Sequence, residues 1–443
     1  MPQPTPLTCD LRLDPEWIIP VEPAGVVLAR HSLLVKDGRI AALLPHAEAD
    51  AWIAAEHLSL PSQALIPGLV NLHTHAAMAL LRGFADDLPL MTWLTEHIWP
   101  AEKRWVSPDF VLDGSRLACL EMLKSGVTCF NDMYFFPEQT LVAAVEAGMR
   151  VAAGLIVIDF PSAYAADPDG YLQKGIQIRD AWAQEPLASF CLAPHAPYST
   201  GDKTLEKVAT YAAQLDLPIH MHVHETLDEI HQGLASHHLR PLARLGNLGL
   251  LGPNFIAVHA VHLEPGEIEL LAAQGCHVAH CPSSNLKLAS GLAPVAALLG
   301  TGVNTGLGTD SAASNNRLDL WEEMRLAALL AKGASGDPAV LPAHTALEMA
   351  TLAGARALGL DSQTGSLTPG KLADMVAVDL SGAETQPCYD PISQLVYCAG
   401  RHLVRHVWVA GRSVVDSGIC QTLDEDEVLH RARAWREKIK HLD

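Results

Sequence analysis

Eight short apolar runs, separated by amphipathic stretches of helical length, constrain the fold of this chain more than any other feature. Such alternation is typical of parallel βα units, and eight parallel strands are the number that closes a (β/α)8 barrel. We therefore predict an α/β chain built on a TIM-like barrel. The predicted strands are 64–71, 127–131, 151–158, 189–193, 218–222, 255–259, 277–281 and 303–308.

The two ends of the chain have a different texture, with shorter apolar runs divided by Pro, Gly and Asp. The Asp37-Gly38 dipeptide between two alternating runs is a hairpin signal, and residues 373–418 have a similar pattern of short strands. We predict that residues 1–65 and 369–443 form one small β-sandwich domain, and that residues 66–368 form the catalytic barrel. The charged amphipathic segment 424–442 is predicted to be a helical surface tail.

The composition restricts the partners of the chain. Lys and Arg number 30 against 50 Asp and Glu, which gives a formal charge of −20. So acidic a surface repels a phosphate backbone, which argues against a nucleic-acid polymer as partner. Nine cysteines without a CxxC pair are typical of reduced thiols. The start of the chain shows no secretory signal and no apolar run is long enough to span a membrane, so we expect a cytoplasmic location.

Metal-competent side chains follow several predicted strands. The C-terminal ends of barrel strands converge on one face, where active sites lie. His73 and His75, two residues apart on an extended chain, point to the same side and can chelate one metal ion. The other groups at strand ends are His220, His222, His224 and Glu225, then His259 and His262, and finally Asp310.

Each of these groups alone has a simpler explanation. An isolated His pair is usually a surface or hydrogen-bonded core feature, and three alternating histidines can form a buried polar ladder. Asp310 could cap the N-terminus of the following helix. Their occurrence together, each just after an apolar run, favours a metal site.

Longer motifs resemble the amidohydrolase superfamily over residues 66–316. They are PGLVNLHTHAAMALLRG, APHAPYS, HVHET and GLGTDSAASNN, followed by GSLTPGKLADMVAVD, which resembles the return of such chains into their small β-domain. LPLMTWLTEHIWPAE, together with APHAPYS, points to the methylthioadenosine/S-adenosylhomocysteine deaminase group. The resemblance implies a metal-dependent hydrolytic deaminase that converts the adenine of 5′-methylthioadenosine to hypoxanthine and releases ammonia. Adenosine and S-adenosylhomocysteine are further candidate substrates.

The same resemblance makes His73, His75, His222 and Asp310 the ligands of a divalent ion. Zinc is the first choice for such a donor set, and iron and manganese stay open. Binuclear relatives use a bridging lysine near the fourth strand end. The corresponding residues 191–195 read CLAPH and contain no lysine, so a single metal ion is predicted.

The resemblance also implies catalytic roles for three residues. Glu225 resembles the proton shuttle of the family, which takes a proton from water and delivers it to N1 of the purine. Asp310 passes a proton to the departing amine, besides binding metal. His259 orients the nucleophile or stabilises the developing charge.

Three more residues are expected to bind the substrate. His195 would bond the purine edge, and Glu102 would accept hydrogen bonds from both ribose hydroxyls, which suits a carboxylate. Trp93 would line the thioether end. The simpler readings are a solvated helix glutamate for Glu102 and core packing for Trp93.

The loop after the third strand bears on the choice of substrate. Relatives that accept S-adenosylhomocysteine need a cation for its carboxylate, for which Arg is the natural partner. Residues 159–171 contain neither Arg nor Lys, and Arg150 precedes the strand. The absence of a cation from this loop favours methylthioadenosine, whose tail is a neutral thioether.

Two other classes of function stay open. One is a guanine deaminase or triazine-type chlorohydrolase of the same superfamily, against which Glu102 and His195 argue. The other is a non-catalytic barrel that binds metal or nucleoside, against which Glu225 argues because a binding protein needs no acid–base group beside a metal. Homodimers are common among such enzymes, but the sequence indicates no interface.

Overall fold

The structure is a computed structural model that describes residues 7–440. The first six residues, where we expect no secretory signal, and the end of the predicted segment 424–442 lie outside this range. Within residues 7–440, no helix is both long and apolar enough to cross a membrane.

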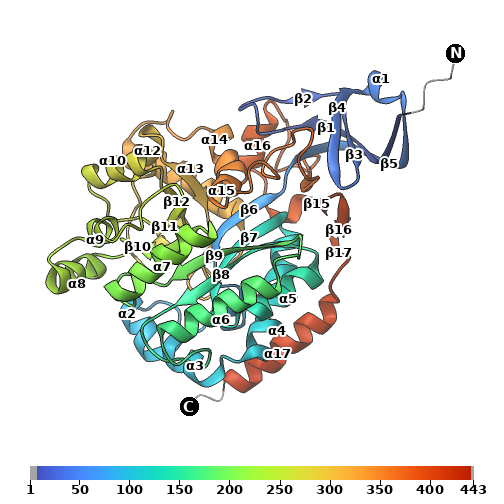
Figure 1. The fold of residues 1–443 in the computed structure, drawn as a ribbon. Coiled ribbons are helices and arrows are strands. Elements are labelled where there is room, and N and C mark those ends of the chain that lie inside the picture. Colours follow the sequence, from blue (N-terminus) through green and yellow to red (C-terminus); the bar gives the residue numbers. More distant parts are fainter. Residues whose placement is uncertain (1–6, 441–443) are drawn as a thin grey trace.

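Eight parallel strands within the described range form the barrel, as predicted (Figure 1). The barrel closes where the backbone N–H of Asp310 donates to the carbonyl of His73 at 3.0 Å and where Thr74 and Asp310 form a parallel bridge. The strands are β6 (Leu69–Thr74), β7 (Val127–Tyr134), β8 (Arg150–Val157), β9 (Ala188–Pro194), β10 (Ile219–Val223), β11 (Phe255–His259), β12 (His277–His280) and β13 (Asn304–Leu307).

Helices surround these strands and explain their composition. Every residue of β7 and of β8 is buried, as expected where a parallel strand has both faces covered. The surrounding helices are α4 (Pro108–Lys124), α5 (Pro137–Ala147), α6 (Pro168–Ala181), α7 (Asp202–Leu215), α8 (Leu227–His237), α9 (Pro241–Asn247), α10 (Pro265–Gln274), α11 (Pro282–Lys287), α12 (Val295–Gly300), α13 (Leu320–Ser335), α14 (Ala343–Met349) and α15 (Leu352–Ala357).

A long excursion separates β6 from α4. It consists of η1 (Ala76–Leu81), α2 (Leu90–Thr92), the π-helical η2 (Trp93–Ile98) and α3 (Trp99–Trp105). π-Helices are rare in proteins, and those that occur are often found at functional sites. This excursion carries Trp93 and Glu102, two of the residues predicted to contact substrate.

Strands from both chain ends form a second, mixed sheet beside the barrel (Figure 1). The Asp37-Gly38 turn is confirmed, with φ of 50° and 72° between β3 and β4. Within the described residues the sheet has nine strands: β1 (Leu7–Ile18), β2 (Leu28–Ala29), β3 (His31–Lys36), β4 (Arg39–Pro45), β5 (Trp52–Pro67), β14 (Met375–Asp379), β15 (Val404–Val409), β16 (Arg412–Asp416) and β17 (Ile419–Cys420). The fold class is therefore confirmed, while the exact domain boundaries stay a prediction. The remaining short helices are α1 (His46–Ala49), α16 (Pro391–Tyr397) and η3 (Arg401–Leu403).

One predicted strand and one helical segment are each divided in the structure. The predicted strand 64–71 spans the end of β5 and the start of β6, which meet at Gly68. A Cβ on Gly68 would lie 2.0 Å from Oγ1 of Thr128, so the crossing needs glycine. The helical segment 343–358 breaks into α14 and α15, because the carbonyl of Ala350 accepts the N–H of Val70 in β6 at 2.9 Å.

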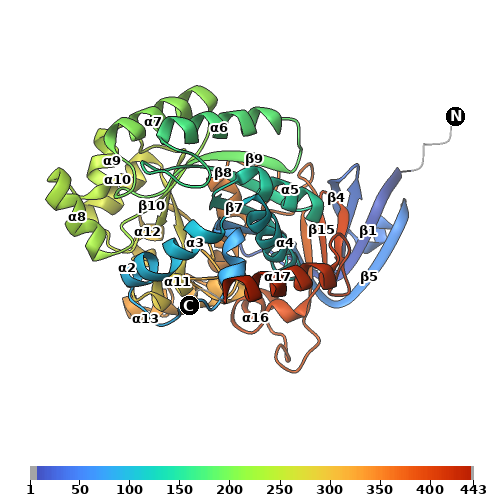
Figure 2. The same cartoon turned by 90° about the horizontal axis from the view of Figure 1, so that it is seen from below.

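The last helix packs against the barrel, whereas the sequence predicted a tail on the surface. Helix α17 (Glu425–Ile439) lies along α4 (Figure 2). Val428, Trp435 and Ile439 are buried there, and the indole N–H of Trp435 donates to Oδ2 of Asp113 at 2.9 Å. The C-terminal segment thus belongs to the outer layer of the barrel.

Candidate active site

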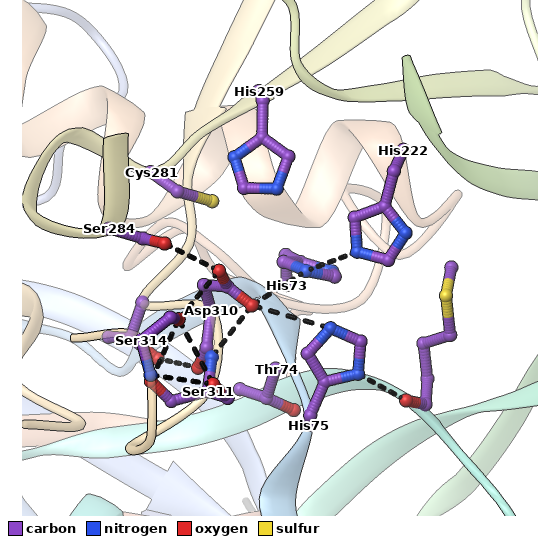
Figure 3. A network of polar contacts seen from close by, with 12 residues as sticks. His73, Thr74, His75, His222, His259, Cys281, Ser284, Asp310, Ser311 and Ser314 are labelled. Atoms are coloured by element: carbon purple, nitrogen blue, oxygen red, sulfur yellow. Dashed lines mark hydrogen bonds and ion pairs between the residues drawn. The ribbon is translucent and has the colours of Figure 1, made fainter. Parts of the chain in front are cut away.

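Four of the predicted residues meet at the C-terminal end of the barrel (Figure 3). His73 ends β6 with His75 just beyond it, His222 lies in β10, and Asp310 follows β13. One ligand atom from each of the four lies within 4.8 Å of all the others. The structure therefore brings together the residues that the resemblance assigned to one metal ion.

The hydrogen bonds of the His75 and His222 rings determine which nitrogen of each ring faces the metal cluster. The Nδ1 atoms of His75 and His222 donate to the carbonyls of Met133 and His195, at 2.5 and 2.7 Å. In the neutral rings, both Nε2 atoms are therefore acceptors. Nε2 of His75 nevertheless faces Oδ1 of Asp310 at 3.3 Å. Two acceptors in contact call for a cation between them.

The burial of the ring nitrogens fits the same ion. Burial lowers the pKa of His73 to about 4 and holds that of His222 well below its ordinary value. Both imidazoles are thus neutral near pH 7, which is the form that binds a metal. Three imidazole nitrogens with one carboxylate oxygen are a donor set that zinc accepts.

Asp310 is oriented by hydroxyl groups that the sequence did not reveal (Figure 3). Ser284 and Ser314 donate to its Oδ2 at 2.6 and 2.8 Å. The backbone N–H of Ser311 donates to Oδ1 at 2.7 Å. With Oδ2 occupied by two donors, Oδ1 is the oxygen directed at His73 and His75. Ligand-orienting partners of this kind tune a metal site.

His73 and His75 also have buried partners. Nδ1 of His73 lies 3.0 Å from Nε2 of His220, so His73 ligates through Nε2 when its Nδ1 donates to His220. The carboxylate of Asp132 accepts the N–H of Ala76 at 2.7 Å and the hydroxyl of Thr74 at 3.0 Å, which fixes the backbone on both sides of His75. His220 was among the polar groups predicted at the strand ends, whereas Asp132 was not predicted from the sequence.

Strained backbone marks the strand ends that carry the site. The φ values of His224, His259 and Asp310 are 56°, 69° and 60°. Non-glycine residues in this left-handed region cost about 1–3 kcal/mol each, and they cluster at active sites.

The cluster opens into a cavity of about 670 Å³. All of the predicted residues that we assigned to catalysis and substrate binding line it. They are Trp93, Glu102, His195, Glu225, His259 and Asp310, and the metal-cluster residues His75 and His222 line it as well.

Glu225 and His259 face each other across this cavity. Oε2 of Glu225 lies 3.8 Å from Nε2 of His259. Burial raises the pKa of Glu225 above its ordinary value, which moves it toward the neutral range that suits a proton shuttle. Nδ1 of His259 donates to Oδ1 of Asn285 at 2.9 Å, so Nε2 is the nitrogen presented to the cavity. Asn285 was missed from sequence.

Glu102 is half-buried at the cavity wall. The hydroxyl of Tyr134, the last residue of β7, donates to its Oε1 at 2.6 Å. This contact orients the carboxylate and leaves Oε2 for another donor. Tyr134 was also missed, because the residues around it resemble an ordinary buried strand.

His195 directly follows the last residue of β9. Its Nδ1 is 3.0 Å from the hydroxyl of Ser199. Burial lowers the pKa of His195 to about 3, so the ring is neutral. With Nδ1 at Ser199, Nε2 is the nitrogen left to bond the edge of a purine.

The outer wall of the cavity is largely apolar. Its residues include Leu90, Trp93, Trp99, Phe160 and Leu288. The exposed Lys103 also lines the cavity, so the site has a cation that inspection of residues 159–171 did not find. A second cavity, of about 340 Å³, adjoins the first at Phe160, Tyr198 and Ser199, which line both.

Comparison with known proteins shows the family to which the chain belongs. Residues 64–414 match the Amidohydrolase family. A 5-methylthioadenosine/S-adenosylhomocysteine deaminase of Teredinibacter turnerae is 48% identical over 433 residues, which cover 98% of each chain. A homologue of the same name from Saccharophagus degradans is 46% identical over 97% of each chain.

Solved structures give the same assignment. An adenosine deaminase from Xanthomonas campestris, crystallised with bound zinc, is 47% identical, with a TM-score of 0.98 over 99% of this chain and 100% of that one. Atrazine chlorohydrolase from Arthrobacter aurescens superposes with a TM-score of 0.90 over 96% and 99% of the two chains, but its 23% identity shows the fold alone. The chain therefore belongs to the amidohydrolase family, among the relatives named 5-methylthioadenosine/S-adenosylhomocysteine deaminases.

Proposed function

We propose that this chain is a zinc-dependent hydrolase that removes the 6-amino group of 5′-methylthioadenosine as ammonia and leaves hypoxanthine on the ribose. One observation carries the proposal: the metal cluster, the acid–base residue Glu225 and the carboxylate of Glu102 line a single cavity. The 48% identical relative named for this activity supports the same substrate.

Zinc would be held by His73, His75, His222 and Asp310. When bound, a divalent ion supplies the Lewis acidity that makes water nucleophilic near neutral pH.

The protein's own groups move the protons. Glu225 takes a proton from the attacking water and delivers it to N1 of the purine, which makes the adjacent ring carbon electrophilic. His259, fixed by Asn285, directs Nε2 at the developing charge. After water has added to the ring carbon, Asp310 takes the remaining proton of the added hydroxyl and passes it to the departing amine, so that the C–N bond breaks, a carbonyl forms and ammonia leaves.

Substrate binding uses the residues on the cavity wall. Oε2 of Glu102, with Oε1 held by Tyr134, accepts from the ribose hydroxyls, and His195 bonds the purine edge. The apolar side chains around Trp93 cover the thioether and exclude water.

Methylthioadenosine is proposed as the preferred substrate because residues 159–171 offer no cation for a carboxylate. Lys103 at the cavity wall favours S-adenosylhomocysteine as a second substrate. Two finer expectations, a homodimer and a cytoplasmic location, stay predictions.

A substrate panel tests the proposal. Purified protein of known zinc content is followed by ultraviolet absorbance with methylthioadenosine, S-adenosylhomocysteine, adenosine, guanine and a chlorinated triazine. We expect the adenine-to-hypoxanthine spectral change with ammonia release, fastest for methylthioadenosine. Turnover of guanine or triazine alone would contradict the proposed reaction, and equal efficiency for both thioether nucleosides would contradict the preference.

A further inference from the structure

The turn between β10 and α8 carries Glu225 over the metal cluster. It begins at His224, whose φ of +56° lies in the left-handed region, where a side chain with a Cβ is disfavoured. His224 is fully buried. Contacts elsewhere in the fold must therefore hold this backbone against its own preference.

Glu229 supplies such a contact. Its Oε1 accepts the backbone N–H of His224 at 2.8 Å, and its Oε2 accepts that of Glu225 at 3.0 Å. The residue is 3% exposed, so water does not compete for these bonds. Hydrogen bonds to a charged acceptor are stronger than bonds between neutral groups. Here each carboxylate oxygen accepts from one of two successive backbone amides.

A comparison within the molecule separates this arrangement from ordinary helix capping. At the start of α10, the N-cap is Glu264, and the side chain of Glu267 accepts the N-cap N–H at 2.8 Å. At the start of α8 the N-cap is Thr226, whose hydroxyl accepts the N–H of Glu229 at 3.3 Å. The carboxylate of Glu229 reaches past this N-cap to the two preceding residues.

The imidazole of His224 is anchored separately. Its Nε2 accepts the N–H of Leu242 at 3.0 Å, and its Nδ1 donates to the carbonyl of His262 at 3.2 Å. The carbonyl of His224 accepts the N–H groups of Val261 and His262, both at 3.0 Å. Glu229 holds the N–H side of the same peptide, together with the N–H of His224 itself.

We infer that Glu229 is a positioning residue for Glu225, whose carboxylate clamps the two amides that direct Glu225 at His259 and the metal cluster. The identity of Glu225 as the proton shuttle rests on the proposed function, whereas the clamp itself is a property of the fold. A displacement of the order of 1 Å at a reacting group costs about a hundredfold in rate, so loss of the clamp acts on kcat.

The test compares Glu229→Gln with Thr226→Ala. Gln keeps the size of Glu229 but replaces one acceptor oxygen by an NH₂ group that cannot accept an amide hydrogen. Thr226→Ala removes the helix cap and leaves both clamp bonds, so it is the matched control. Because burial raises the pKa of Glu229 to about 7, the assays are run at about pH 8.

Two readouts are measured on the zinc-loaded full chain: kcat and KM for methylthioadenosine, and amide hydrogen exchange of the peptide that spans residues 219–230. We expect Glu229→Gln to lower kcat about tenfold or more, with unchanged KM and zinc content and faster exchange at His224 and Glu225. Thr226→Ala should keep kcat and the slow exchange of these two amides. Glu229→Asp, which retains two acceptor oxygens, should recover part of kcat and guards against a folding defect in the Gln variant.

The inference is overturned if Glu229→Gln keeps the kcat of the unsubstituted protein, or if Thr226→Ala loses as much. Unchanged exchange at His224 and Glu225 in the Gln variant would also overturn it. If the unsubstituted protein shows no turnover of methylthioadenosine, the proposed function fails, and the exchange comparison still decides whether Glu229 clamps the turn.

Discussion

The Nδ1 atom of His222 donates to the backbone oxygen of His195 at 2.7 Å, which joins a metal-site residue to a proposed purine-binding residue. The link uses the backbone of His195 and leaves Nε2 of its ring available for substrate. We therefore expect a separation of effects, in which mutation of His222 changes metal affinity and mutation of His195 changes substrate affinity.

We predict that His195→Ala retains zinc but binds methylthioadenosine more weakly. The carbonyl that orients His222 stays in place, while a side-chain hydrogen bond worth about 0.5–1.5 kcal/mol is lost, so KM rises up to about tenfold. Steady-state kinetics and metal analysis check this. His222→Ala is the comparison, and it should lose zinc. Zinc loss in His195→Ala as large as in His222→Ala would refute the separation.

Glu225→Gln should lower kcat by about 10²–10⁴, the usual share of general acid–base catalysis. The change preserves the shape of the side chain and removes its ability to carry a proton. Glu225 is not a member of the metal cluster, so zinc per chain should stay the same. Single-turnover rates check the loss of activity, and metal analysis of the same preparation checks that the zinc content is unchanged. Normal turnover in this variant would remove Glu225 from the mechanism.

Substitution of Glu102 should act on the ribose end of the substrate. Hydrogen bonds to a charged group are worth about 1.5–3 kcal/mol, so Glu102→Gln should reduce kcat/KM for methylthioadenosine about tenfold to a hundredfold. Tyr134→Phe, which only frees Oε1 of Glu102, should have a smaller effect. Free adenine, which has no ribose, is the control substrate. If its turnover falls equally, Glu102 does not recognise the ribose.

Glu323 should make stability depend on pH. Its carboxylate is 1% exposed and accepts from the backbone N–H of Ser283 and the amide of Asn315, at 3.0 and 2.7 Å. Burial raises its pKa from 4.5 to about 8. The folded state therefore binds more protons than the unfolded state, and the stability that this provides is full below 4.5 and lost as pH rises toward 8.

Urea unfolding of Glu323→Gln and the unsubstituted protein across this pH range measures the effect. We expect the free energy of unfolding of the unsubstituted protein to fall more steeply with pH than that of the variant. Parallel curves would mean that Glu323 does not titrate in this range.

Two regularities predicted metal-competent groups at one face of the barrel, and the resemblance to the amidohydrolase superfamily selected the four ligands among them. Residues two apart on a strand share a side, which pairs His73 with His75, and barrel strand ends converge, which brings His222 and Asp310 to the same face. The partners of these residues depend on register between neighbouring strands. Tyr134 reaches Glu102 only because β7 lies beside β6 and ends beneath α3, and no local pattern encodes that distance.

The same distinction holds for the outer layer. In α17, Val428, Trp435 and Ile439 are spaced seven and four apart, so they form one apolar stripe on a highly charged helix. The stripe signals a packed face, but its partner, Asp113 of α4, lies 322 residues earlier in the chain. The sequence did not predict that Lys103 lines the cavity, because its position there depends on how the excursion after β6 folds across the barrel.

The most direct test of the account is reconstitution of chelator-treated protein with zinc, followed by the ultraviolet change of methylthioadenosine. We predict that zinc-free protein is inactive and that activity returns in proportion to zinc and saturates at about one ion per chain, because His73, His75, His222 and Asp310 provide one four-donor site. Turnover that persists in zinc-free protein, or its absence from fully loaded protein, would contradict the central claim that this cavity is a metal-dependent deaminase site.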